Sequence, residues 1–139
     1  PSRGGGDMIL TSLRTNQLSG AGMDWYARYL ASFEACDVDT FLSFLAVDCV
    51  VQTNSRMPYY GHDGLRKTLQ RYFEAFEVVH EPINIFGCDD QFGTEMLTHF
   101  RSRGGAEPIL IPAVSFYTRT RSGLLNSIRH YVDDSPLSS

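Results

Sequence analysis

The segment covering residues 24–76 changes its hydrophobic period twice, and no other feature of the sequence limits the fold as strongly. Trp25, Tyr29 and Phe33 recur every four residues, which predicts a helix over residues 24–36 with one aromatic face and an aspartate as its N-cap. The pattern then becomes strand-like and, further along, helical again. This order of elements predicts helices packed against a sheet.

The second half of this segment predicts a short helix, a strand and a longer helix. Asp37 ends the first helix, and Asp39 is suited to cap a short helix carrying the apolar run 41–45. The β-branched run 49–53 predicts a strand. Gly61 then admits a third helix. Its apolar face is formed by Leu65, Leu69, Tyr72, Phe73 and Phe76.

Strand-like alternation dominates the rest of the chain. The predicted strands cover residues 80–87, 92–103, 109–121 and 124–133. Their short connections predict an antiparallel meander, and Pro82 and Pro112 predict edges or bulges where the sheet bends. We therefore expect an α+β fold. A cone-shaped, curved, mixed or mostly antiparallel sheet of about five strands would wrap around three N-terminal helices and enclose a pocket.

Length, composition and charge set the broad class of protein. The 139 residues are enough for one hydrophobic core. The formal net charge of −4 argues against nucleic-acid binding through phosphate neutralisation, and no apolar block is long enough to span a membrane. Cys36, Cys49 and Cys88 lack a metal-binding spacing, which indicates a reducing compartment. We therefore expect a cytoplasmic protein with no nucleic-acid or membrane partner.

The N-terminal segment differs from the rest of the chain. Residues 1–22 begin with PSRGGGD and lack clear helical or strand periodicity. We expect a flexible leader or tag-like tail that contributes little to folding. A single domain over residues 23–139 follows.

Alternation along the strands predicts which side chains face the pocket. His130 is the one polar side chain on an apolar strand face, and Thr98 is the polar exception on the face that it shares with Met96 and Phe100.

Other strand residues have the opposite parity and are expected on the outer face of the sheet. They are Ile83, Ile85, Leu97 and Tyr117. Apolar area on this face predicts a homodimer.

Three stretches of the chain resemble the SnoaL-like members of the nuclear transport factor 2 superfamily. They are WYARYLASFEACDVDTFLSFLAVDC, YYGHDGLRKTLQRYFEAF and IRHYVDDSPL. The resemblance covers about residues 23–137, and the superfamily includes ketosteroid isomerase, scytalone dehydratase and limonene epoxide hydrolase. It implies a cystatin-like α+β barrel with an internal pocket.

The resemblance carries over only some functional residues. Tyr29 falls where ketosteroid isomerases place the tyrosine that donates to a developing oxyanion. Their catalytic aspartates do not carry over, because the base position falls near Thr53 or Asn54 and the second acid near Val114. Asn84 matches a strand position where scytalone dehydratase carries a histidine.

The Asp–Arg–Asp relay of the epoxide hydrolases of this superfamily is absent. The corresponding positions hold Met96, Thr98 and His130, and only Asn54 stands in for the amide that holds water. Epoxide hydrolysis by this relay is therefore disfavoured.

The leading hypothesis is a cofactor-independent enzyme that isomerises, cyclises or dehydrates a hydrophobic, oxygenated small molecule by acid/base chemistry in an apolar pocket. The expected catalytic residues are His130, which titrates near neutrality, and Tyr29 and Asn54 as hydrogen-bonding groups. The expected substrate-binding residues are Trp25, Phe33, Asn84, Met96, Thr98, Phe100 and Phe116. No residue cluster has metal-ligand spacing, so no metal or cofactor is expected.

Two other functions are compatible with the sequence. The same cavity suits a non-catalytic small-molecule-binding protein, and the outer sheet face suits a dimeric protein-interaction module. Individual residues also keep structural alternatives: His130 as a core histidine with one buried hydrogen bond, Tyr29 as a core aromatic, and Asn54 as a turn residue. His80 and Glu81 are expected to be structural.

Overall fold

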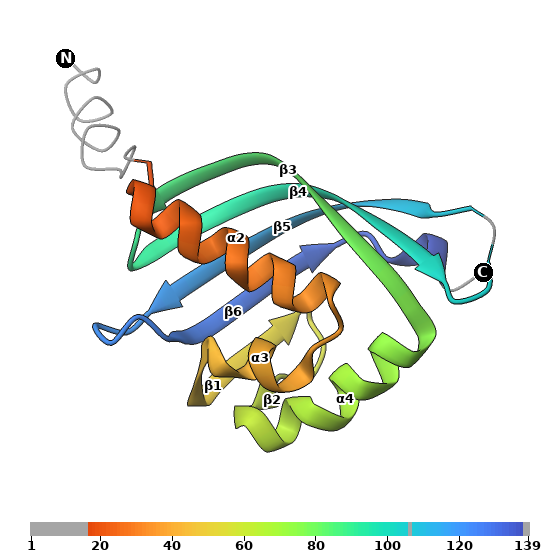
Figure 1. Ribbon diagram of the computed structural model, residues 1–139, viewed down its shortest axis with the longest axis horizontal. Helices are drawn as coiled ribbons and strands as arrows, with labels where there is room; N and C mark the ends of the chain where they lie inside the picture. The colour runs from red at the N-terminus through yellow and green to blue at the C-terminus, as the bar shows by residue number, and fades with distance from the viewer. Residues whose placement is uncertain (1–16, 106, 138–139) are drawn as a thin grey trace, which may run out of the picture.

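The computed structural model describes residues 17–105 and 107–137, where three α-helices pack against one sheet (Figure 1). The helices are α2 (Gly20–Glu34), α3 (Val38–Ser43) and α4 (Gly61–Ala75), and a 3₁₀ turn, η1 (Ser135–Leu137), follows the last strand. The strands are β1 (Leu45–Thr53), β2 (Tyr59–Tyr60), β3 (Phe76–Cys88), β4 (Gln91–Ser102), β5 (Ile109–Arg119) and β6 (Leu125–Val132). The predicted α+β class is confirmed.

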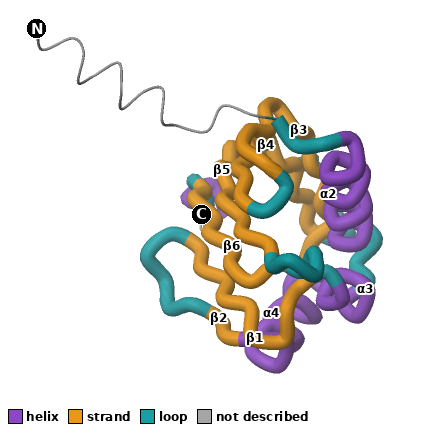
Figure 2. Tube along the Cα trace, turned by 90° about the vertical axis from the view of Figure 1, so that its left-hand side faces the viewer, coloured by secondary structure: helices purple, strands orange, loops and turns teal. Residues whose placement is uncertain are grey.

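The described strands form one mixed, six-stranded sheet in the order β2-β1-β6-β5-β4-β3. Neighbouring strands are antiparallel, except that β1 and β6 run parallel. The sheet curves around the helices and stays open, so the predicted barrel does not close (Figure 2). One strand more than expected is present because Tyr59 and Tyr60 pair with Val51 and Val50.

Helix α2 begins at Gly20, not near the predicted cap Asp24. The hydroxyl of Ser19 accepts a hydrogen bond from the Gly22 amide at 3.0 Å and donates to Asp89 at 2.5 Å. Leu18 is buried in the core. Leu18, Ser19 and the first turn of α2 therefore contact the rest of the fold. Residues 1–16 lie outside the described residues.

Helix α3 also begins earlier than expected. The carboxylate of Asp37, rather than that of Asp39, caps it by accepting the Thr40 amide at 3.1 Å. The third helix is confirmed: α4 begins at Gly61, which has φ 74°, and a Cβ there would lie 2.7 Å from the Val47 carbonyl oxygen. Only glycine suits this junction.

All three helices cover the concave face of the sheet (Figure 2). The core between the two layers is rich in aromatic residues, including Tyr26, Tyr29, Phe41, Phe73 and Phe92. Pro82 lies at a register shift in the edge strand β3, as predicted. Pro112 lies in the central strand β5, where it pairs with Leu97 without a register shift, so the edge or bulge predicted for it is wrong. It precedes the first β5–β6 pair, Ala113 with Val132.

The outer face of the sheet carries apolar side chains, but only part of the predicted set. Ile83 is 59% exposed and Leu97 is half-buried. Ile85 packs against the core instead, and Tyr117 is buried within it. Ile85 turns inward because the register of β3 shifts between Pro82 and Asn84, and Tyr117 lies on the inward face of β5.

Candidate functional site

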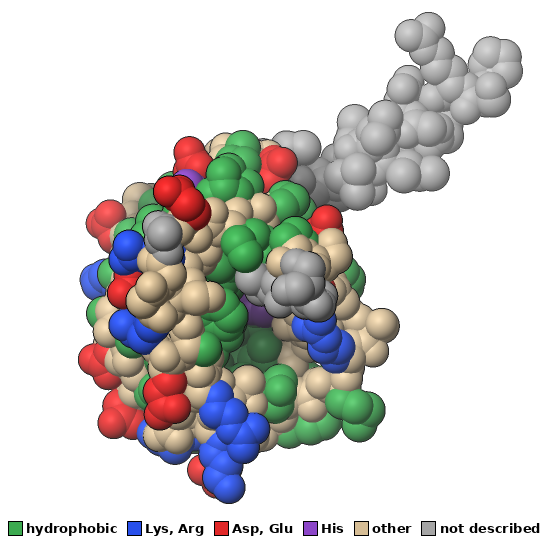
Figure 3. Space-filling view, turned by 90° about the vertical axis from the view of Figure 1, so that its right-hand side faces the viewer, with side chains coloured by type: hydrophobic (Ala, Val, Ile, Leu, Met, Phe, Trp, Pro, Cys, Tyr) green, Lys and Arg blue, Asp and Glu red, His purple; other side chains and the backbone are tan. Residues whose placement is uncertain are grey.

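A cavity of about 370 Å³ lies between the helices and the concave face of the sheet. Its walls come from all three helices and from all six strands, and most of the lining side chains are apolar or aromatic. Figure 3 shows a hollow in which hydrophobic side chains and a histidine are visible. This size and lining suit a small, largely apolar ligand held by a few polar groups.

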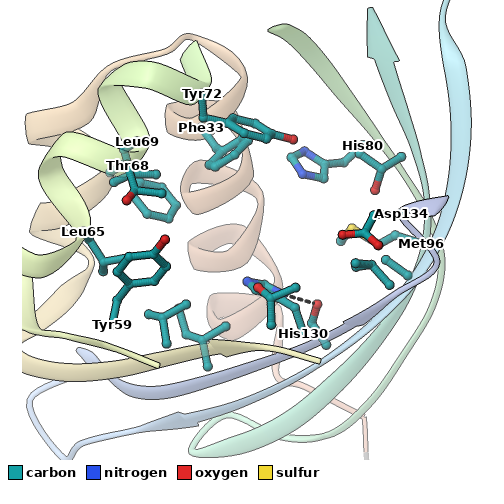
Figure 4. Close-up of a pocket in the computed structure, with 18 of the residues that line it drawn as sticks. Phe33, Tyr59, Leu65, Thr68, Leu69, Tyr72, His80, Met96, His130 and Asp134 are labelled. Carbon is teal, nitrogen blue, oxygen red and sulfur yellow. Dashed lines mark hydrogen bonds between the residues drawn. The ribbon is translucent and has the colours of Figure 1, made fainter. Parts of the chain in front are cut away.

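His130 projects from β6 into this cavity, as predicted from strand alternation (Figure 4). Its Nδ1 lies 2.6 Å from the hydroxyl of Ser115, its direct partner on β5. Burial, followed by the proximity of His80, lowers the pKa of His130 to about 4. The imidazole is therefore neutral at pH 7, with Nε2 left for a ligand.

Buried hydroxyl groups continue inward from Ser115. The hydroxyl of Tyr26 lies 3.1 Å from that of Tyr117 and donates to Thr94 at 3.3 Å. Burial raises the pKa of Tyr117, and the nearby hydroxyl groups of Ser115 and Tyr29 act against this rise. These contacts link His130 to a cluster of neutral donors in the core.

Tyr29 lines the cavity and is 4% exposed. Burial, followed by the proximity of Tyr117, raises the pKa of Tyr29 well above its ordinary value. The phenol therefore keeps its proton at neutral pH and is available as a hydrogen-bond donor, which is the property that its predicted role requires.

His80 on β3 reaches the same cavity, although the sequence suggested a structural role for it. Its main-chain N–H donates to Glu34 Oε2 at 3.3 Å, and its Nδ1 lies 3.5 Å from that oxygen. Burial lowers the pKa of His80, while Glu34 acts in the opposite direction. The cavity thus holds two imidazoles.

Exposed and half-buried side chains surround the mouth of the cavity. Arg56 and Met57 from the β1–β2 connection and Tyr59 from β2 line the cavity with Asp134, which follows β6. Arg56 and Asp134 form an ion pair. The mouth therefore combines an apolar rim with one charged pair.

Four of the predicted substrate-binding residues line the cavity. They are Phe33, Met96, Thr98 and Phe100. Phe33 lies on the inner face of α2, and the other three alternate along β4, so the predicted parity of this strand is confirmed.

Trp25 does not line the cavity. It lies one turn before Tyr29 and packs on that ring at 5.9 Å and on Phe44 and Phe92, with the Arg119 guanidinium 3.9 Å above its indole. The prediction that Trp25 shares a helix face with Tyr29 is correct, but Trp25 lies beyond the end of the cavity.

Asn84 and Phe116 do not line the cavity either. The register shift after Pro82 reverses the parity of β3, so Asn84 is exposed and Ile85 turns inward. On β5, Phe116 packs on the outer face beside Phe86 and Tyr131, whereas Ser115 and Tyr117 face inward.

Asn54 lies outside the cavity lining and is committed to the main chain. Its side-chain amide donates to the Val132 carbonyl and accepts the Val132 N–H, both at 3.0 Å. Asn54 has φ 52°, in the left-handed region that asparagine tolerates better than most residues. It fastens the end of β1 to β6, which matches the turn alternative better than a substrate contact.

Sequence reasoning missed Ser115, Tyr117 and His80. In β5 (ILIPAVSFYTR) both faces carry apolar residues, so alternation could not define the inner one. The inward direction of His80 could have been predicted, because it lies two residues after the buried Val78 in β3 and faces the same side of the sheet. Within the described ranges, no group of three or more His, Cys, Asp or Glu is placed to hold a metal ion.

No helix in the described part of the chain is long and apolar enough to cross a membrane.

Solved structures with the same fold are found at low sequence identity, so they inform on the fold alone. A candidate SnoaL-like polyketide cyclase from Shewanella denitrificans has a TM-score of 0.74 and 18% identity over 86% of this chain and 96% of its own. An epoxide hydrolase of the limonene-epoxide-hydrolase type from M. tuberculosis has a TM-score of 0.69 and 16% identity, covering 81% and 82%. SalBIII, an epoxide hydrolase/cyclase-like enzyme in pyran ring formation in salinomycin, also has a TM-score of 0.69 and 16% identity, covering 81% and 91%.

No protein of curated function matches the sequence. The family model for the SnoaL-like domain matches residues 26–128, which include the lining residues on α2, α4 and β1–β5 and end within β6. This match covers well over half of the chain. The protein therefore belongs to the SnoaL-like domain family.

Proposed function

We propose that this protein is a cofactor-independent enzyme that carries out acid/base chemistry on a hydrophobic, oxygenated small molecule inside the cavity. The observation that carries the proposal is the neutral imidazole of His130, which faces an apolar cavity and is held by Ser115. A group of this kind exchanges protons with a bound substrate without a cofactor.

The hydroxyl of Tyr29 would donate a hydrogen bond to the substrate oxygen. Removing a proton beside a carbonyl group moves negative charge onto that oxygen, and a buried donor stabilises this charge more than water does. Met96, Phe100 and Phe33 would hold the apolar part of the molecule. Asn54 is excluded from this role because its amide is occupied by Val132.

The reaction class we favour is cyclisation or isomerisation. Similarity to a candidate polyketide cyclase and to a cyclase-like enzyme of pyran ring formation supports this choice at the level of the fold. Hydrolysis of an epoxide by an Asp–Arg–Asp relay is not proposed. Two of its positions are taken by Met96 and Thr98, which face the cavity without a charge.

The experiment uses 2-tetralone, a hydrophobic ketone with acidic C–H groups, as a probe. In deuterated buffer, NMR follows exchange of these protons with and without the protein. We expect saturable exchange that is abolished by Ala113→Phe, which fills the cavity, and retained by Ala31→Phe on the exposed surface of α2. Binding of the ketone without faster exchange would instead support a non-catalytic binding protein.

We also propose that the protein is a homodimer formed through the outer face of the sheet. Phe86, Phe116 and Tyr131 pack there, with ring centroids 6.3 Å apart for Phe86 and Phe116 and 6.0 Å apart for Phe116 and Tyr131. Ile83 and Val79 on the edge strand β3 are more than half exposed. A second copy would remove this apolar area from water.

A further inference from the structure

His80 and Glu34 form a second titratable pair at the wall of the cavity. The two residues come from β3 and from the last position of α2. Of the buried side-chain nitrogen and oxygen atoms in the described ranges, only Nδ1 of His80 has no hydrogen-bond partner. A buried polar atom of this kind requires an explanation, and the Glu34 carboxylate oxygen 3.5 Å away offers one.

The surroundings of His80 fix the direction of its ring. The Phe33 ring packs against the imidazole edge-on, with centroids 5.5 Å apart. Glu34 Oε2 accepts the main-chain N–H of His80, which holds the carboxylate on the Nδ1 side. Since the ring also lines the cavity (Figure 4), Nε2 is the nitrogen available to a ligand.

His80 and His130 differ in their partners. His130 Nδ1 contacts the neutral hydroxyl of Ser115, whereas His80 Nδ1 faces a carboxylate. The titratable groups that share the cavity with His80 are Tyr72 from α4, Tyr59 from β2, Tyr29 from α2, Tyr117 from β5, His130 from β6, and the ion-paired Arg56 and Asp134 at the mouth. A carboxylate beside one imidazole stabilises a positive charge there, and repulsion then disfavours a second charge on the other.

We infer that His80 is a second proton-transfer residue of the cavity, with Glu34 as its positioning residue. Nε2 of His80 takes a proton from a weakly acidic C–H or O–H group of the substrate, and the imidazolium then donates Nδ1–H to Glu34. The electron pair of the broken bond stays on the substrate as an enolate or phenolate. Nε2 later returns the proton to the product, so no oxidant or co-reactant is needed.

This assignment rests on the proposed function and narrows its substrate class. An enolisable ketone or a phenol places its oxygen between the two histidines, where the Tyr29 hydroxyl donates a hydrogen bond to the developing negative charge. A substrate without such an acidic group would gain nothing from the Glu34–His80 pair.

The first test needs no turnover. NMR titration of the imidazole signals compares the intact protein with Glu34→Gln, Glu34→Asp and Ser115→Ala. We expect Glu34→Gln to lower the pKa of His80. In Glu34→Asp the pKa of His80 should stay close to its value in the intact protein, and Ser115→Ala should change the titration of His130 only. An unchanged His80 titration in Glu34→Gln would overturn the inference.

The second test uses 2-naphthol, whose fluorescence distinguishes the phenol from the phenolate. Bound to the intact protein, naphthol should ionise at a lower pH than in water, and Glu34→Gln and His80→Gln should abolish this shift. Naphthol that ionises equally in the intact protein and in Glu34→Gln would contradict the role of the pair. The protein could fail to exchange the protons of 2-tetralone while Glu34→Gln still lowers the pKa of His80. This result would count against the proposed function and not against the Glu34–His80 pair.

Discussion

Ser115 on β5 and His130 on β6 are direct partners across two antiparallel strands, and the Ser115 hydroxyl lies 2.6 Å from Nδ1 of the imidazole. Backbone pairing therefore fixes the position of both groups. This contact leaves Nε2 as the nitrogen that a ligand meets. The cavity obtains an oriented, neutral base from strand register alone.

Burial of His130 predicts a pH dependence of stability. Its pKa falls from 6.5 in the unfolded chain to about 4 in the folded protein, so the unfolded state binds more protons between these values. This contribution to stability is fully present above about pH 6.5 and is lost as the pH falls toward 4. The loss is on the order of 3 kcal/mol at most, at about 1.4 kcal/mol for each pKa unit.

Chemical denaturation at several pH values measures this loss. His80 adds to it with the same sign, because burial lowers its pKa as well. The carboxylates of Asp37, Asp89 and Asp134 have pKa values below 3.8 and weaken the fold only at lower pH. The free energy of unfolding should therefore depend less steeply on pH in His130→Gln than in the intact protein. An equally steep dependence would refute the view that His130 is buried in its neutral form.

Asn54 is predicted to act through stability and not through catalysis. Asn54→Ala removes both hydrogen bonds to Val132 and places alanine at φ 52°, which together should cost roughly 1–3 kcal/mol. Asn54→Gly loses the same bonds but adopts this φ freely, so it should be the less destabilised of the two. Denaturant titration of both variants checks this order. A reversed order would show that backbone strain at this turn is negligible.

The start of the folded domain makes a third prediction. A chain beginning at Met23 lacks the buried Leu18 and the Ser19 cap, whereas a chain beginning at Gln17 keeps both. Burial of a leucine contributes roughly 1.5–3 kcal/mol to the free energy of unfolding, and a helix cap contributes about 1 kcal/mol. The shorter chain should therefore melt at a clearly lower temperature. Equal melting temperatures of the two chains would support the domain start at residue 23 that the sequence predicts.

The proposed dimer predicts that Ile83→Glu, on the outer sheet face, lowers the sedimenting mass at micromolar concentration. Val47→Glu is the matched control, because Val47 is 79% exposed on β1, away from the aromatic cluster. We expect the intact protein and the control to sediment as dimers. A purely monomeric intact protein would exclude the proposal.

Much of the fold could be predicted from the sequence because its periodicity is strong. The spacing of Leu65, Leu69 and Phe73 gave α4 correctly, and alternation placed Thr98 and His130 in the cavity. These predictions need only local geometry, since each strand residue faces opposite to its neighbours.

The remaining site residues depend on information that no local pattern holds. A register shift after Pro82 turned Asn84 outward, and apolar residues on both faces of β5 concealed the inward direction of Tyr117. Glu34 lies close to His80 only because α2 crosses β3, a contact between residues far apart in the chain. Pairing across the sheet and between layers decides these positions.

The central claim is that His130 exchanges protons with a ligand in the cavity, and the most direct measurement is the rate of 2-tetralone proton exchange by His130→Gln. Glutamine is polar and close in size, so the variant should fold with a melting temperature near that of the parent. Exchange should fall well below the parental rate, with His80 left as the remaining proton-transfer residue. Exchange at the parental rate would contradict the claim. So would a variant destabilised by on the order of 1–3 kcal/mol that still catalyses exchange while folded, because His130 would then be a structural hydrogen-bonding residue.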